Sequence, residues 1–317
     1  MKRILLAVLL VGVTAIWGWT FVVVKDATAA YGVVGFLAIR FAIAAAALGP
    51  ICLKRATWRT LRAGAAIGVA MAAGYLLQTF GLQYTMPTNS GLITGLFVVF
   101  APISAKAFFR VRLDRALLVS VVISLIGLVL LTGQMPGEFR VGDFLTLGCA
   151  AAFGLHIALL SRYARDHDAL VLALGQMLAA AVLFGAAWPF AEPMALPSGQ
   201  VWLSLLLVGV VASALAFYIQ TLVQQRLSAA GTAIILTMEP VFAVLFGYWL
   251  AGDRLTAIQV AGAACVLAAQ VWATAWGLRR RDAAYRSVTP PGGQRRQLPH
   301  AGLKATVEGP EGPGEKN

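Results

Sequence analysis

A carboxylate inside a long apolar run is the first residue of this sequence that invites a chemical interpretation. Glu239 lies about ten residues into the run 229–250 and directly precedes Pro240. Proline removes a backbone hydrogen bond, so Pro240, like Pro102 in the run 89–109, is predicted to kink its helix. Apolar surroundings disfavour the charged form of a carboxylate, which suits reversible proton binding or contact with an ammonium group. A structural carboxylate that caps freed N–H groups or pairs with an arginine is the alternative.

Arg40 is the cationic counterpart, about eight residues into the apolar run 32–53. Its guanidinium stays charged at any reachable pH. The side chain must therefore face a partner, a water-filled cavity or an anionic group of a bound molecule, and a guanidinium holds a carboxylate through two parallel hydrogen bonds. An ion pair within the chain, for instance with Glu239, is an equally good interpretation.

Two glutamines and a histidine are weaker candidates. Gln78 and Gln220 each lie within an apolar run, where their amides either hydrogen-bond a ligand or tie neighbouring helices together. The second role is the commoner one for amides between membrane helices. His156 stands alone in its run; it is either a proton relay or a structural group with a satisfied ring, and the structural role is preferred.

Small polar and aromatic side chains complete the candidates. Asn89, Ser90 and Thr94 open one apolar run, where they either line the mouth of a cavity or cap the helix, the capping role being favoured for Asn89. Four aromatic residues, Trp17, Trp19, Phe21 and Tyr75, offer an apolar wall for a bound molecule. Single aromatics on membrane helices more often pack against other helices or face lipid.

Composition predicts the elements that must hold these residues. Charged residues make up 12% and hydrophobic residues 60% of the 317 residues, whereas a soluble domain carries about 25% charged residues. The mean hydropathy is +0.81. Apolar runs of about 20 residues recur, long enough to cross a ~30 Å hydrocarbon core as helices, and the alternating segments of a β-barrel are not found. We predict an all-α integral membrane protein with ten transmembrane helices, at roughly 4–24, 32–53, 61–83, 89–109, 116–134, 143–161, 169–190, 201–224, 229–250 and 257–278.

Basic residues are unevenly distributed between the loops. With the N-terminus inside, twenty Lys and Arg residues fall in cytoplasmic segments and three on the opposite side. This bias predicts that both termini are cytoplasmic, and it accounts for the net charge of +12 without a nucleic-acid partner. The run 4–24 is too long for a signal peptide and is predicted to be an uncleaved helix. Residues 279–317, rich in Pro, Gly and charge, are predicted to form a disordered cytoplasmic tail.

Motifs for catalysis, cofactors and metals are not found in the sequence. It has neither a Gly-Lys-Ser/Thr phosphate loop nor a His-Glu-x-x-His pair. Cys52, Cys149 and Cys265 fall in separate apolar runs and are predicted to be buried apolar thiols rather than metal ligands or redox groups. Gly64 and Gly68 predict a close helix contact, either within the bundle or in a dimer. We expect no enzyme, no cofactor and no metal.

The two halves of the sequence resemble each other. Pairs of residues recur in the same order across five apolar runs, at offsets from 136 to 142: Trp17-Gly18 with Phe153-Gly154, Arg40-Phe41 with Gln176-Met177, Gln78-Thr79 with Gln220-Thr221, Ala101-Pro102 with Glu239-Pro240, and Arg112-Leu113 with Arg254-Leu255. Five is an odd number of spans, so the second half must cross in the opposite sense. We predict two inverted five-helix repeats, at 1–134 and 141–278. Inverted repeats are typical of secondary transporters, which bind substrate near the midplane between the halves.

Three segments carry a family resemblance. Residues 81–96, GLQYTMPTNSGLITGL, resemble the entry to the fourth helix of the EamA-type group in the drug/metabolite transporter superfamily. Residues 234–242, IILTMEPVF, followed by GDRLT at 252–256, are similar to the same group. The resemblance covers residues 1–278 and implies a ten-helix inverted-repeat carrier, often an exporter of amino acids or related metabolites. One position departs from it: the acidic residue before Arg-Leu is Asp253 in the second half but Val111 in the first.

The sequence thus predicts a multi-pass transporter of the plasma membrane, or of the cell inner membrane in a bacterium. Its partners are a small-molecule substrate and the lipid bilayer, and we expect secondary export by alternating access with proton coupling through Glu239. A membrane sensor or assembly partner that has a transporter-like bundle without turnover is the alternative. The lack of a soluble signalling domain in the sequence counts against it.

Overall fold

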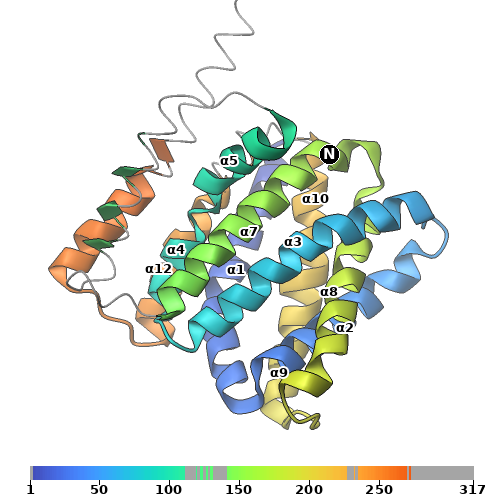
Figure 1. The fold of residues 1–317 in the computed structure, drawn as a ribbon, viewed down its shortest axis with the longest axis horizontal. Coiled ribbons are helices and arrows are strands. Elements are labelled where there is room, and N and C mark those ends of the chain that lie inside the picture. Colours follow the sequence, from blue (N-terminus) through green and yellow to red (C-terminus); the bar gives the residue numbers. More distant parts are fainter. Residues whose placement is uncertain are drawn as a thin grey trace, which may run out of the picture. The chain divides into compact units, whose positions relative to one another are not determined.

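The computed structural model describes residues 3–110, 119, 122–123, 126–127, 129–130, 141–226, 232, 235–269 and 271–272. All the regular elements in these ranges are helices (Figure 1). They are α1 (Arg3–Tyr31), α2 (Val33–Cys52), α3 (Trp58–Leu82), α4 (Pro87–Thr94), α5 (Phe97–Phe109), α7 (Val141–Tyr163), the 3-10 turn η1 (Ala164–Asp166), α8 (Ala169–Ala191), α9 (Gly199–Leu206), the π-helix η2 (Leu207–Leu215), α10 (Ala216–Arg226), α12 (Met238–Leu250) and a last helix, Ala257–Ala269.

The prediction of an all-helical membrane protein is confirmed. Within the described ranges, seven helical stretches are long and apolar enough to cross a membrane, and the helices Met238–Leu250 and Ala257–Ala269 are shorter apolar ones. The predicted spans at 229–250 and 257–278 are described only in part. The span at 116–134 lies mostly outside the described residues, as does the tail 279–317. The count of ten and the orientation stay predictions.

The fourth predicted span begins earlier than expected and is broken. The prediction that Asn89 caps it is wrong, because α4 starts at Pro87 and its N-cap residue is Met86. Proline suits this first position, where no N–H partner is needed. Gly95 and Leu96 then form a turn before α5 begins. The span is thus two helical pieces, with the break in its middle.

Asp253, from the segment after α12, caps the N-terminus of α4 across the bundle. Its Oδ2 accepts a hydrogen bond of 2.9 Å from the backbone N–H of Thr88. The N-cap residue Met86 has no side-chain oxygen to do this, so Asp253 satisfies a donor that the local sequence leaves unpaired. The acidic residue that is present in only one half of the repeat therefore has a structural role at α4.

Replacing Asp253 with alanine is expected to lower the stability of the purified protein by about 1 kcal/mol, the usual contribution of a helix cap. Thermal unfolding in detergent, followed by tryptophan fluorescence, measures the change. Asp26→Ala is the matched control, because Asp26 is an exposed carboxylate on α1. Equal unfolding temperatures for the two variants would remove the capping role.

Two glycines make reciprocal contacts between the halves. A Cβ atom at Gly18 of α1 would lie 2.5 Å from Cβ of Phe242 and 2.8 Å from the backbone N of Ala243, in α12. A Cβ atom at Gly154 of α7 would lie 2.5 Å from Cβ of Phe100 and 2.9 Å from the backbone N of Ala101, in α5. Helix α1 accordingly packs on α12, and α7 packs on α5.

These contacts correct one predicted match. Phe100-Ala101 corresponds to Phe242-Ala243, an offset of 142, so Ala101 does not correspond to Glu239. At the same offset Gly95 corresponds to Thr237, and both are turn residues. Helix α5 begins two residues after Gly95, and α12 begins directly after Thr237. The offset of 138 is wrong because it pairs two prolines that lie at different positions in their helices. Pro102 lies inside α5, whereas Pro240 is in the first turn of α12.

The kink predicted at Pro240 stays a prediction, but the start of α12 places this proline near a helix end. It is the third residue of α12, where the backbone N–H would have no intrahelical partner in any case. The interruption of the ninth span comes just before it, at Thr237. This position places Glu239 in the first turn of α12, two residues after the turn residue Thr237.

Close approaches also join α3 to α8 and α2 to η2. A Cβ atom at Gly64 would lie 2.5 Å from the carbonyl oxygen of Leu172, and one at Gly68 would lie 2.7 Å from Cα of Gln176. The predicted small-xxx-small contact thus lies within the bundle. Around η2, a Cβ atom at Gly209 would lie 3.0 Å from the carbonyl oxygen of Arg40. These helix pairs position the side chains described next.

Candidate functional site

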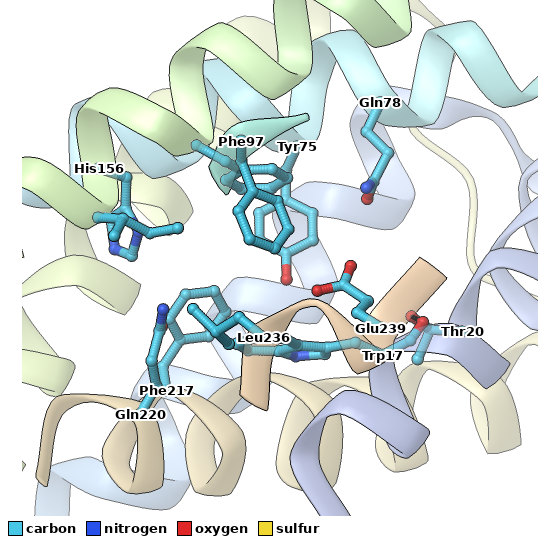
Figure 2. A pocket seen from close by; sticks show the side chains of 12 residues that line it. Trp17, Thr20, Tyr75, Gln78, Phe97, His156, Phe217, Gln220, Leu236 and Glu239 are labelled. Atoms are coloured by element: carbon cyan, nitrogen blue, oxygen red, sulfur yellow. Dashed lines mark hydrogen bonds between the residues drawn. The ribbon is translucent and has the colours of Figure 1, made fainter. Parts of the chain in front are cut away.

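The described residues enclose a cavity between helices of both halves. Its lining side chains come from α1, α3, α5, α7, α10, α12 and the turn of helix before α12 (Figure 2). They are Trp17, Thr20, Tyr75, Gln78, Phe97, Phe153, His156, Ile157, Phe217, Gln220, Leu236 and Glu239. The cavity therefore brings together six of the predicted candidates: Trp17, Tyr75, Gln78, His156, Gln220 and Glu239.

Most lining residues come in pairs that occupy corresponding positions in the two halves. At an offset of 136 the pairs are Trp17 with Phe153 and Thr20 with His156; at an offset of 142 they are Tyr75 with Phe217, Gln78 with Gln220, and Phe97 with Glu239. The cavity thus lies where equivalent faces of the two halves meet. The last pair is chemically unequal, since one half contributes a phenyl ring where the other contributes a carboxylate.

Glu239 brings a carboxyl group into this cavity without an obvious partner. The side chain is 6% exposed. Among the described residues it makes neither an ion pair nor a hydrogen bond. Figure 2 shows the hydroxyl of Tyr75 and the carboxyl of Glu239 directed toward one another. The predicted ion pair between Arg40 and Glu239 does not form in the described part of the chain.

Arg40 is not among the residues that line the cavity, and its contact with a bound anion stays a prediction. Its Nε donates a 2.8 Å hydrogen bond to Oγ of Ser213. The guanidinium carbon lies 4.3 Å from the ring centroid of Tyr75 and 5.3 Å from that of Phe41. Cation–π attraction contributes to holding the charge there. One nitrogen, Nη2, has no partner among the described residues.

The two glutamines differ in their hydrogen bonding. Nε2 of Gln78 donates a long 3.4 Å hydrogen bond to Oγ1 of Thr94, and Thr94 in turn lies 3.8 Å from the sulfur of Cys149. Oε1 of Gln220 is buried and has no partner among the described residues. Thr94 is therefore a neighbour of the cavity rather than part of its lining, and Gln220 leaves an acceptor unused.

His156 lines the cavity, and one of its two ring nitrogens has a hydrogen-bond partner. Its Nε2 lies 2.7 Å from Oε1 of Gln176, the residue that corresponds to Arg40 in the other half. The imidazole packs edge-on against the ring of Phe217, with centroids 5.7 Å apart. Asn89, by contrast, is buried outside the lining, and its Oδ1 lacks a partner among the described residues.

Aromatic rings form most of the cavity wall. Of the four aromatic residues predicted for it, Trp17 and Tyr75 line the cavity, whereas Trp19 and Phe21 are not among its lining residues. The ring of Tyr75 packs edge-on against Phe153 at 5.1 Å and Phe217 at 6.0 Å, and Trp17 lies 5.3 Å from Phe217. The Nε1 of Trp17 donates its hydrogen bond to the carbonyl of Ala212, 2.9 Å away. A repeat alignment extended residue by residue would have found Phe217, because it corresponds to Tyr75.

These features define the class of protein: an α-helical multi-pass membrane protein with a cavity shared by two similar halves, as in small-molecule transporters. The EamA-like transporter family matches residues 4–133 and again residues 140–275. The chain belongs to the EamA-like transporter family, and it is a membrane transporter rather than an enzyme.

Individual relatives agree with this assignment. A protein of Archaeoglobus fulgidus described as an uncharacterized transporter is 35% identical over 259 residues, which cover 82% of each chain. The threonine/homoserine exporter RhtA of Salmonella typhimurium is 28% identical over 160 residues, about half of either chain at 49% and 53%. A solved crystal structure with 21% identity has a TM-score of 0.63 and covers 86% of this chain and 98% of its own, which shows a shared fold.

Proposed function

We propose that the chain is a secondary transporter that moves small metabolites by alternating access between two inverted five-helix repeats. The observation that supports this most is the pairing of lining residues, in which corresponding positions of the two halves face one cavity. In such a carrier, one half rocks against the other around a fixed site. The reciprocal glycine contacts of α1 with α12 and of α7 with α5 are the surfaces at which this motion would occur.

Export of amino acids or related compounds is the direction and substrate class of the proposal. The similarity to a threonine/homoserine exporter supports it. The charge bias between loops supports a plasma-membrane placement, or the cell inner membrane in a bacterium, with both termini in the cytoplasm. The cavity would then take substrate from the cytoplasm and release it outside.

Proton coupling through Glu239 completes the proposal. The carboxyl group is buried, lines the cavity and has no described ion-pair partner. Carboxyl groups inside membrane helices that face a cavity are typical members of proton pathways. A bound proton and a bound substrate would then influence each other at the same place.

Comparison of spent medium from strains that lack or overproduce the protein tests the export function. We expect at least one small metabolite to accumulate outside the overproducing cells, and the purified protein in liposomes to exchange that metabolite in radiolabelled form by counterflow. Threonine and homoserine are the first compounds to assay. Unchanged media together with absent counterflow would contradict transport and favour a sensor or assembly partner.

A further inference from the structure

Two side chains of the cavity lining hold hydrogen-bond acceptors without a partner among the described residues. Glu239 presents a carboxyl group that makes no ordinary hydrogen bond to another described residue, and Oε1 of Gln220 is likewise without a described partner. Both side chains are more than nine-tenths buried, at 6% and 2% exposure. The Tyr75 hydroxyl, directed toward Glu239 (Figure 2), can donate only one hydrogen bond. Buried acceptors left without donors are costly, so the remaining acceptor sites favour a ligand that brings N–H donors.

The cavity offers no matching positive group. None of the described lining residues is a lysine or arginine. Arg40 is not a lining residue, and its guanidinium carbon lies 4.3 Å from the ring centroid of Tyr75, which is one. His156 already directs its Nε2 at Gln176, 2.7 Å away. A carboxylate entering the cavity would meet a carboxyl group and aromatic rings, without a cation to neutralise it.

Aromatic surfaces surround the acceptors. Five rings line the cavity, and they belong to Trp17, Tyr75, Phe97, Phe153 and Phe217. The indole N–H of Trp17 is directed away to a backbone carbonyl. Aromatic faces attract organic cations as well as apolar groups, because the ring quadrupole is negative at its face. The walls therefore suit a ligand with an apolar or aromatic body attached to its cationic end.

From this chemistry we propose that the cavity selects organic amines: a primary ammonium group bound by Glu239 and Gln220, an apolar or aromatic body packed among the rings, and no carboxylate. The inference rests on the proposed transport function and narrows its substrate class. Free amino acids would bind less well than their decarboxylated counterparts. The carboxylate of an amino acid loses its hydration on entering and finds no charged partner in exchange.

Three compounds with the same phenyl ring isolate the two charged groups. Phenethylamine has the amine alone, phenylalanine has the amine and the carboxylate, and 3-phenylpropionate has the carboxylate alone. Isothermal titration calorimetry on the purified full chain in lipid nanodiscs should rank phenethylamine first, with phenylalanine about tenfold weaker or more. No heat of binding is expected for 3-phenylpropionate. Phenylalanine binding as tightly as phenethylamine would overturn the proposal.

Two variants test whether the ranking of the three compounds depends on the carboxyl group of Glu239. Glu239→Gln should weaken phenethylamine binding about tenfold or more, because it removes the negative partner of a desolvated ammonium group. Asp26→Asn makes the same chemical change at an exposed site on α1 and should leave binding unchanged. Circular dichroism and unfolding temperature verify that both variants fold. Equal phenethylamine affinity in Glu239→Gln and the parent protein would overturn the assignment.

Counterflow separates this inference from the proposed function. Exchange of threonine or homoserine, with no binding of phenethylamine, would leave a transporter in place and overturn the amine selectivity. Glu239-dependent binding of phenethylamine, without exchange of any compound by the purified protein and with unchanged media, would support the site chemistry and contradict transport. Exchange of phenethylamine in preference to phenylalanine is the result expected if both are right.

Discussion

Glu239→Gln is expected to abolish substrate accumulation driven by a pH gradient in proteoliposomes, reducing it to the level of protein-free liposomes. An amide has the size and hydrogen-bonding shape of a carboxyl group but exchanges no proton at physiological pH. If this residue couples proton movement to substrate movement, a pH gradient can no longer drive substrate uptake by the Glu239→Gln variant. The measurement is uptake of the radiolabelled metabolite with and without the gradient.

The pH profile of exchange gives a second readout of the same variant. In the parent protein, exchange should change with pH as Glu239 gains or loses its proton. In Glu239→Gln the remaining exchange should be insensitive to pH, since the titrating group at the cavity has been removed. Glu239→Asp, which still titrates, should keep a pH dependence although its shorter side chain lowers the rate.

Asp26→Asn serves as control here too, because it removes an exposed carboxylate from α1 without touching the cavity. It should transport like the parent protein under every gradient. Gradient-driven uptake by Glu239→Gln equal to that of the parent would end the coupling role of Glu239. The transporter assignment would survive that result, because it depends on the family and on the fold.

The sequence alone indicated which polar residues lie inside membrane helices, but not whether their side chains face the cavity. Glu239, Gln78 and Gln220 were recognised because each is a polar group inside an apolar run, and all three line the cavity. Arg40 satisfied the same criterion yet is not among the lining residues. Its contact with Ser213 depends on the π-helix Leu207–Leu215 opposite α2, and no residue pattern that we identified in that apolar segment predicts such a helix.

The start of α4 shows a second limit of local reasoning. Asn89 has the right residue type for a helix cap, and the apolar run begins there. The helix instead begins at Pro87, and its cap comes from Asp253, 165 positions along the chain. A contact of that separation is a product of tertiary packing. The apolar runs, in contrast, were predictable because chain composition alone decides whether a helix of that length suits a bilayer.

Phe97 illustrates why the cavity wall was underestimated. A phenylalanine in a membrane helix carries no functional signal by itself. Its position became informative only when the contacts of Gly18 and Gly154, with Phe242 and Phe100, fixed the offset of 142. At that offset Phe97 corresponds to Glu239, and both line the cavity. The repeat therefore predicts location well, whereas the chemistry at each paired position is free to differ between the halves.

The reciprocal glycine contacts predict a matched pair of packing defects. Gly18→Ala and Gly154→Ala should each lower stability by about 1–3 kcal/mol, the usual cost of an added methyl group in a closely packed interior. The new Cβ atoms would lie 2.5 Å from Cβ of Phe242 and of Phe100, and within 3 Å of backbone atoms that cannot rotate away. Helix α1 must then move from α12, or α7 from α5. Thermal unfolding in detergent measures the loss, and counterflow measures its effect on turnover.

Gly12→Ala on α1 and Gly185→Ala on α8 are the controls, because a Cβ atom at either position meets nothing within 4 Å. Alanine is the better helix former, so these variants should be as stable as the parent or slightly more stable. The two destabilising changes occupy separate helix pairs and should add in the double variant Gly18→Ala/Gly154→Ala. If either tight-contact variant unfolded at the temperature of its control, that contact would not be as close as described, and the offset of 142 between the halves would lose its main support.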